Sequence, residues 1–182
     1  MRYVLLLSLV LTTMTVANAE RRTPALPSAV RASLDQHYPG WKFPTVSPLV
    51  TDLFVSWESR PTTAGLPHLI EGDFDRDGKR DYAVLIVHGN VFNAAGVPFE
   101  RREKLIVFLR RGRGYQSRLL SSEGFNSEVY LGQQHRGDVV YDLATDRTFV
   151  CEKDAIIFCY FEKGATLHVY RRGKFRQIIV GD

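Results

Sequence analysis

Short apolar segments separated by turn residues recur along most of this chain, and they constrain its fold more than any other feature. They are rich in Val, Ile, Leu, Phe and Tyr, and glycine-containing turns separate several of them. Segments of this length and composition are typical of β-strands. The sequence therefore predicts roughly eight to ten short strands, mostly antiparallel. The segments are 52–57, 68–73, 81–88, 104–111, 115–121, 128–132, 138–143, 148–151, 155–161, 166–172 and 175–182.

One segment near the N-terminus has helical spacing instead. In LPSAVRASLDQHYPGW, residues 26–41, Val30 and Leu34 lie four positions apart and fall on one face of a helix. Ser28 is placed to cap the helix, and Pro39 would end it. The expected fold class is α+β: an N-terminal helix packed on a mostly antiparallel, meander-rich β-sheet.

The last three segments, 155–161, 166–172 and 175–182, are separated by short turns and predict a meander. Two stretches, residues 89–103 and 121–138, show no clear apolar periodicity. These are the two longest inserts without periodicity, and the second contains the predicted strand segment 128–132.

The first residues of the chain have the composition of a signal peptide. Arg2 precedes an apolar stretch over residues 4–10, and the small residues Ala17 and Ala19 follow it. An anchoring helix and a buried first helix are alternatives, although a membrane span needs about 20 apolar residues. We expect cleavage after Ala19, and hence a periplasmic or secreted bacterial protein without stable membrane insertion after cleavage.

These features divide the chain into three parts. Residues 1–19 are the predicted signal peptide. Residues 20–27 are polar and interrupted by proline, and are expected to be a flexible arm. Residues 28–182 are long enough for a hydrophobic core and show no internal boundary, so they are expected to form a single domain.

The charge distribution argues against a nucleic-acid partner. The formal net charge is +4, and acidic and apolar residues interrupt the basic clusters ERREK, LRRGRG and YRRGKFR. Nucleic-acid binding needs a stronger excess on one face. Phe161, Tyr170 and Phe175 alternate with cations near the C-terminus. This alternation is compatible with a face that binds carbohydrate or polyanions, but it favours an ordinary sheet with one buried side.

The chain has two cysteines, Cys151 and Cys159. In an exported protein an even number permits a disulfide. A hairpin centred on Ala155 would place the two opposite each other, close enough for a bridge. We favour this disulfide, and two buried thiols are the alternative.

The stretch LIEGDFDRDGKRDYAVLIV, residues 69–87, gathers four aspartates around a glycine. These are Asp73, Asp75, Asp77 and Asp81. Calcium takes roughly six to eight oxygen ligands, and alternating carboxylates on a tight loop can converge on one ion. Gly78 permits the sharp turn, and Lys79 would contribute its backbone carbonyl. Without an ion the carboxylates would repel one another. The motif therefore favours a Ca²⁺ site over an acidic solvated turn.

This loop lies between two predicted strands, whereas an EF-hand loop lies between helices, and Val84 stands where an EF-hand has its bidentate glutamate. The arrangement resembles the FG-GAP/VCBS-type repeats of integrin-like propellers and many exported bacterial proteins, whose familiar form is GDFDGDGKxDLxV. The resemblance covers residues 69–88 and differs at Arg76, where glycine is common. It implies a calcium loop. It does not imply a full propeller, because a propeller needs at least about four blades of four strands.

The expected role of the ion is structural, since a full oxygen shell leaves little room for a substrate. We therefore expect an exported calcium-binding protein with a binding or structural role, an unknown protein or carbohydrate ligand, and no enzymatic activity. The alternative is a small metal-dependent hydrolase that uses the aspartate cluster together with His88, which follows the strand after the loop.

Overall fold

The computed structural model describes residues 26–44, 68–92, 98–125, 129–160 and 164–181. The predicted signal peptide, most of the predicted arm and the predicted strand at 52–57 lie outside these ranges.

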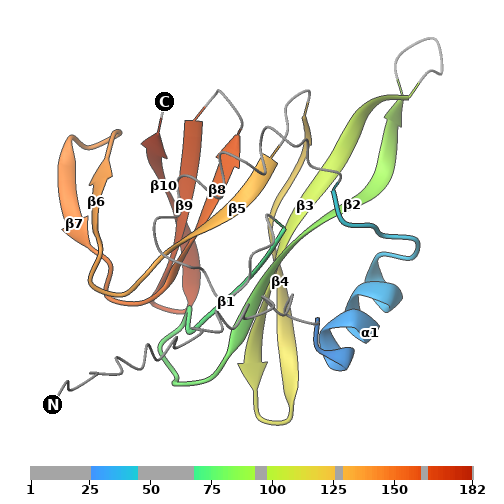
Figure 1. The fold of residues 1–182 in the computed structure, drawn as a ribbon, viewed down its shortest axis with the longest axis horizontal. Helices are drawn as coiled ribbons and strands as arrows, with labels where there is room; N and C mark the ends of the chain where they lie inside the picture. Colours follow the sequence, from blue (N-terminus) through green and yellow to red (C-terminus); the bar gives the residue numbers. More distant parts are fainter. Residues whose placement is uncertain (1–25, 45–67, 93–97, 126–128, 161–163, 182) are drawn as a thin grey trace, which may run out of the picture.

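The described residues form two four-stranded sheets and one two-stranded sheet, and every strand pairing is antiparallel. With one short helix beside them, this confirms the β-rich part of the predicted fold (Figure 1). The first sheet contains, in order, β1 (Leu69–Gly72), β2 (Asp81–Phe92), β3 (Pro98–Arg111) and β4 (Gly114–Phe125). The second contains β10 (Lys174–Gly181), β9 (Gly164–Arg171), β8 (Ala155–Tyr160) and β5 (Val129–Gln134). The third contains β6 (Val139–Asp142) and β7 (Arg147–Val150).

The two four-stranded sheets enclose the main core. Side chains from both sheets and Phe74 from the β1–β2 loop meet there, and each is almost completely buried. Burying one large apolar side chain stabilises a fold by about 1.5–3 kcal/mol, so this cluster is the chief source of cohesion between the sheets. Its members are Ile70, Phe74, Ala83, Leu85, Leu105, Val107, Leu109, Val129, Leu131, Ile156 and Phe158.

Successive side chains on a strand point to opposite faces, so the first sheet has a second apolar face. Val84 and Phe108 lie on it, in one buried cluster with Val30 and Leu34 of helix α1 (Ser28–His37). Partly buried Trp41 and Phe43, which follow the helix, border the same cluster. Among the described residues, no helix is long and apolar enough to cross a membrane.

The predicted cap of this helix is wrong. Ser28 is already the first helical residue, and Pro27 takes the N-cap position without any side-chain capping bond. The Pro27 carbonyl accepts the N–H of Arg31 at 2.9 Å, so the first turn is closed through the backbone. Proline suits this end of a helix because its φ is already near the helical value.

The predicted C-terminal meander is confirmed, since β8, β9 and β10 pair in sequence order. The inserts at 89–103 and 121–138 are largely paired as strands, and the strand predicted at 128–132 within the second is confirmed by β5. Strand β2 continues to Phe92 and β3 already begins at Pro98, while β4 and β5 occupy much of the second stretch. Backbone hydrogen bonds pair these strand ends, so the strands continue where apolar and polar side chains no longer alternate.

The hairpin expected between the cysteines does not form. β8 pairs with β5 and β9, so Cys159 lies opposite Tyr130 and Ala165. Cys151 follows β7 and exchanges backbone hydrogen bonds with Gly137 and Asp138. No disulfide joins the two cysteines, and each is a buried thiol. The disulfide prediction is therefore wrong, because it assumed that adjacent segments in the sequence are also partners in the sheet.

Candidate metal site

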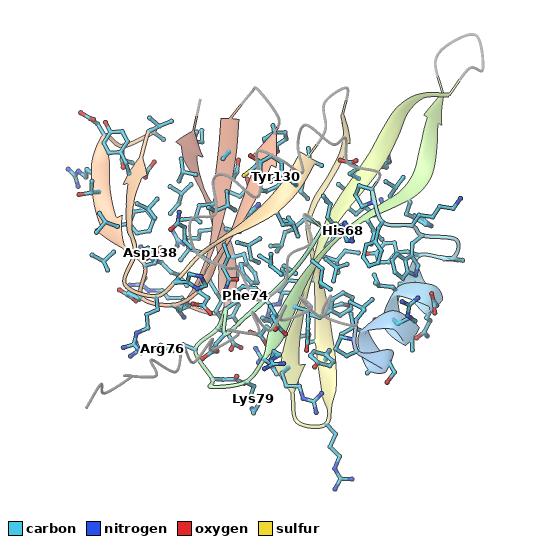
Figure 2. All side chains as sticks on the ribbon, in the orientation of Figure 1. His68, Phe74, Arg76, Lys79, Tyr130 and Asp138 are labelled. Atoms are coloured by element: carbon cyan, nitrogen blue, oxygen red, sulfur yellow. The ribbon has the colours of Figure 1, made fainter. Side chains whose placement is uncertain are left out.

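The aspartate loop connects β1 to β2, as the sequence predicted. In the β1–β2 pairing Gly72 lies opposite Asp81, so the first and last residues of the loop are brought together by the strand ladder. The exposed residues Arg76 and Lys79 lie on the outer side of the loop, whereas Phe74 points into the core between the sheets (Figure 2). Phe74 therefore anchors the loop to the core between the sheets.

Three of the predicted ligands converge. Asp73, Asp75 and Asp81 each offer a carboxylate oxygen, and these oxygens lie within 4.8 Å of one another. Two oxygens on opposite sides of a calcium ion, each about 2.4 Å from it, are also about 4.8 Å apart. The donor set consists of carboxylate oxygens, which suits a hard cation. The separation and the chemistry of these groups thus fit a calcium ion.

Asp81 is the fully buried member of this group. Its Oδ1 accepts the N–H of Arg110 at 2.7 Å and its Oδ2 accepts the N–H of Phe74 at 3.0 Å. Burial raises the pKa of Asp81 to about 6, with a further upward contribution from the charges of Asp75 and Asp77, while the two N–H bonds oppose the shift. A cation in the loop would stabilise the ionised form.

Backbone N–H groups hold the other two carboxylates. Asp73 accepts from Asp77 and Gly78, both at 3.0 Å, and Asp75 accepts from Asp77 at 3.3 Å. The tight turn requires positive φ at Gly78 (78°) and at Arg76 (66°). Glycine adopts such a conformation without strain, whereas arginine does not. Arg76 therefore carries local backbone strain.

Asp77 is not part of the converging group. Its Oδ2 is 3.0 Å from Nζ of Lys79 and 3.4 Å from Nη1 of Arg111. The hydrogen bond from Lys79 is the main cause that lowers the pKa of Asp77. Arg111 also reaches Asp75, with Nη2 2.5 Å from Oδ2. Arg111, at the end of β3, therefore neutralises part of the loop and would compete with an ion for the same carboxylates.

The loop is also attached to the second sheet. Asp154, just before β8, accepts the N–H of Asp73 at 3.1 Å and the N–H of Arg136 at 3.2 Å. A Cβ added to Gly72 would lie only 2.8 Å from Nε2 of Gln133 on β5, so the two sheets approach closely at this point. The sequence did not identify Asp154 or Arg111, because both are distant along the chain from the aspartates.

His88 is not brought to the site. It lies seven residues beyond Asp81 on β2, which corresponds to roughly 23 Å along a strand. Its ring instead forms an edge contact with Tyr38, with the ring centroids 5.4 Å apart. The geometry therefore gives no support to a hydrolytic centre that combines His88 with the aspartates.

The chain matches no family model, no curated protein and no solved structure. Its candidate function follows from the geometry and chemistry of the loop.

Proposed function

We propose that this chain is an exported calcium-binding protein in which one Ca²⁺ fastens the β1–β2 hairpin. Asp73, Asp75 and Asp81 supply the central carboxylates. Asp77 joins them by turning from Arg111 toward the ion, and Lys79 contributes its backbone carbonyl. The role of the ion is structural, and the protein as a whole acts as a binding or structural component with a protein or carbohydrate ligand.

The observation that carries this proposal is the convergence of three carboxylates around the fully buried Asp81. Like charges at this separation repel, and burial makes the charge on Asp81 more costly still. A divalent cation removes both costs at once. Because Asp73 is also hydrogen-bonded to Asp154, the ion would stabilise the attachment of the loop to the second sheet as well.

Export follows from the signal-peptide pattern of residues 1–19 and places the protein where calcium is plentiful. Calcium sites of extracellular modules have dissociation constants of about 10⁻⁴–10⁻³ M. An affinity in this range suits a loop whose negative charge is offset by Lys79, Arg80 and Arg111.

We also propose a packing role for the N-terminal helix. Helix α1 serves as a cover for the outer face of the first sheet within the single domain 28–182. The support for this cover is the complete burial of Val30 and Leu34 in one cluster with strand residues.

Calorimetric titration of the purified protein with CaCl₂ tests the proposal. We expect one ion per chain with a dissociation constant near 10⁻⁴–10⁻³ M, and much weaker binding of Mg²⁺, which demands stricter octahedral geometry. Asp73→Asn should abolish saturable binding. The matched control is Asp142→Asn at the end of β6, far from the aspartate loop along the chain, which should leave it unchanged. Absence of binding in the parent protein, or equal binding by both variants, would falsify the proposal.

A further inference from the structure

A second candidate site lies at the opposite edge of the two main sheets. There, β4 of the first sheet faces β9 and β10 of the second across a cavity of about 480 Å³. Pockets for small ligands have volumes of about 300–1,000 Å³. The lining residues that matter here are Arg118 and Leu120 of β4, His168 of β9, and Lys174, Phe175 and Gln177 of β10.

The charge of this cavity is positive. Arg118 and Lys174 line it, and no acidic side chain does so among the described residues. Arg118 is held in place from two sides: its Nη1 donates to the carbonyl of Gly173 at 2.7 Å, and its guanidinium lies 5.7 Å from the ring centre of Tyr170. A guanidinium that is fixed in this way presents its remaining N–H groups at little further entropic cost.

A buried polar group borders the same cavity. His168 is 1% exposed, and its Nε2 has no hydrogen-bond partner in the described part of the chain. Burial lowers the pKa of His168 to about 4, so the ring is neutral at neutral pH. A buried nitrogen without a partner is unfavourable, and such groups in native proteins generally have a partner in a ligand or a bound water.

We propose that this cavity binds a small organic anion. The acidic group of the ligand lies between Arg118 and Lys174, its apolar body rests against Leu120 and Phe175, and Nε2 of His168 forms a hydrogen bond with one of its polar atoms. The site is separate from the aspartate loop, and its occupancy requires no calcium.

Charge rather than aromatic stacking selects the ligand. Tyr170, which contacts Phe175 of the cavity wall, already has Arg118 and Lys153 within cation–π distance of its ring, the latter at 5.4 Å. A sugar ring would therefore find no uncommitted aromatic surface on Tyr170. The partly buried Phe175 is packed edge-on against Tyr170 at 5.0 Å and offers an apolar wall of limited size. These features favour a small acid with a short apolar body over a polysaccharide chain.

The experiment is an NMR titration of the full protein with three probes that share a phenyl ring: phenylacetate, phenyl phosphate and the neutral phenylacetamide, the last matching phenylacetate in shape. We expect saturable binding of at least one anion, a shift of the His168 Nε2 resonance on saturation, and no saturable binding of the amide. The two anions distinguish a carboxylate from a phosphate ligand. Arg118→Met should weaken anion binding at least about tenfold, the effect of losing one charge-assisted hydrogen bond. Arg113→Met, at the exposed β3–β4 turn, is the matched control and should change it less than about twofold.

Three results would overturn the proposal. The first is the absence of saturable binding of either anion at millimolar concentration. The second is equal binding of phenylacetate and phenylacetamide. The third is equal weakening by Arg118→Met and Arg113→Met, which would indicate only non-specific attraction to a basic surface. The His168 signal is read in the parent protein, so the test does not depend on a buried variant that folds poorly.

Discussion

The two edges at which the main sheets meet carry opposite charge. At the β1/β5 edge, acidic groups converge, and backbone N–H groups and Arg111 already hold them. At the β4/β10 edge, Arg118 and Lys174 line a cavity that contains no acidic group among the described residues. The acidic edge is formed by neighbours in the sequence, and the basic edge by residues from three strands. The first edge can therefore be recognised from a motif, and the second only from the fold.

The two edges are also linked by a short series of contacts. Nζ of Lys153 is 3.5 Å from the carbonyl oxygen of Asp75 and 5.4 Å from the ring centre of Tyr170. Arg118 contacts the same ring. Removing a group at one edge and measuring the effect at the other therefore shows whether the edges act independently.

The largest effect is expected from Asp81→Ala. The substitution leaves the N–H groups of Phe74 and Arg110 without their acceptor and removes the central carboxylate of the loop. We expect the free energy of unfolding to fall by about 3–4 kcal/mol, measured by urea denaturation. The same experiment on Asp142→Ala, at the end of β6, should give a change below about 1 kcal/mol, because its side-chain hydrogen bond to Thr145 is exposed. Similar losses in both variants would mean that the acidic edge has no special structural role.

The second-largest effect is expected at the basic edge, where His168 makes the free energy of unfolding depend on pH. The pKa of His168 is about 4 in the folded protein, against its ordinary value of 6.5 when unfolded. The folded state then binds fewer protons than the unfolded state between these two pH values. The contribution of His168 to the free energy of unfolding is therefore fully present above pH 6.5 and is lost as the pH falls toward 4. The loss attributable to this residue is on the order of 3 kcal/mol. His68 has a similar shift and adds to the slope.

An NMR titration of the His168 ring is the direct measurement. We expect the ring to stay neutral well below pH 6 in the folded protein and to titrate near its ordinary value in urea. A folded-state midpoint near 6.5 would show that the ring is accessible to water, and the basic edge would then be an ordinary wet surface.

Asp154→Ala should moderately lower both the free energy of unfolding and the calcium affinity of the acidic edge. It removes the acceptor for the N–H groups of Asp73 and Arg136, so we expect a loss of about 1–2 kcal/mol in the free energy of unfolding. Calcium affinity should fall a few-fold although Asp154 is not a proposed ligand, because the loop loses its attachment to the second sheet. Unchanged stability and affinity would show that this attachment is dispensable.

The smallest effect is expected from Arg111→Gln, which should raise calcium affinity, whereas Asp154→Ala should lower it. Arg111 pairs with Asp75 and Asp77, so an ion must displace it. Removing its charge should raise calcium affinity by about threefold in calorimetric titration. Arg113→Gln keeps the loop contacts intact and is the control. A decrease in affinity would indicate that Arg111 organises the loop for the ion rather than competing with it.

Much of the loop could be predicted from the sequence, because its geometry is local. The alternation of Asp73, Asp75 and Asp77, the glycine at the turn and the flanking strands are all encoded within about twenty residues. Asp77 shows the limit of such a prediction. Its carboxylate is directed to Lys79 and Arg111, and Arg111 comes from a different strand.

The remaining differences come from contacts between distant parts of the chain. The cysteine hairpin was wrong because β8 found partners in β5 and β9, which no local pattern reveals. Strands β2 and β3 extend further than expected. Apolar periodicity indicates only that one face of a strand is buried, whereas Asn90 and Arg101 pair through their backbone groups and need no buried side chain. His168 lies within the predicted strand segment 166–172, and only the opposing β4 makes it part of a cavity.

The most direct test of the calcium loop is the melting temperature of the parent protein and of Asp75→Ala, each with excess chelator and with about 5 mM CaCl₂. At a dissociation constant of about 10⁻⁴–10⁻³ M, mass action predicts that calcium raises the melting temperature of the parent by about 2–8 °C. The Asp75→Ala protein should show no rise. No rise in the parent protein, or an equal rise in both proteins, would contradict the assignment of a structural calcium ion to this loop.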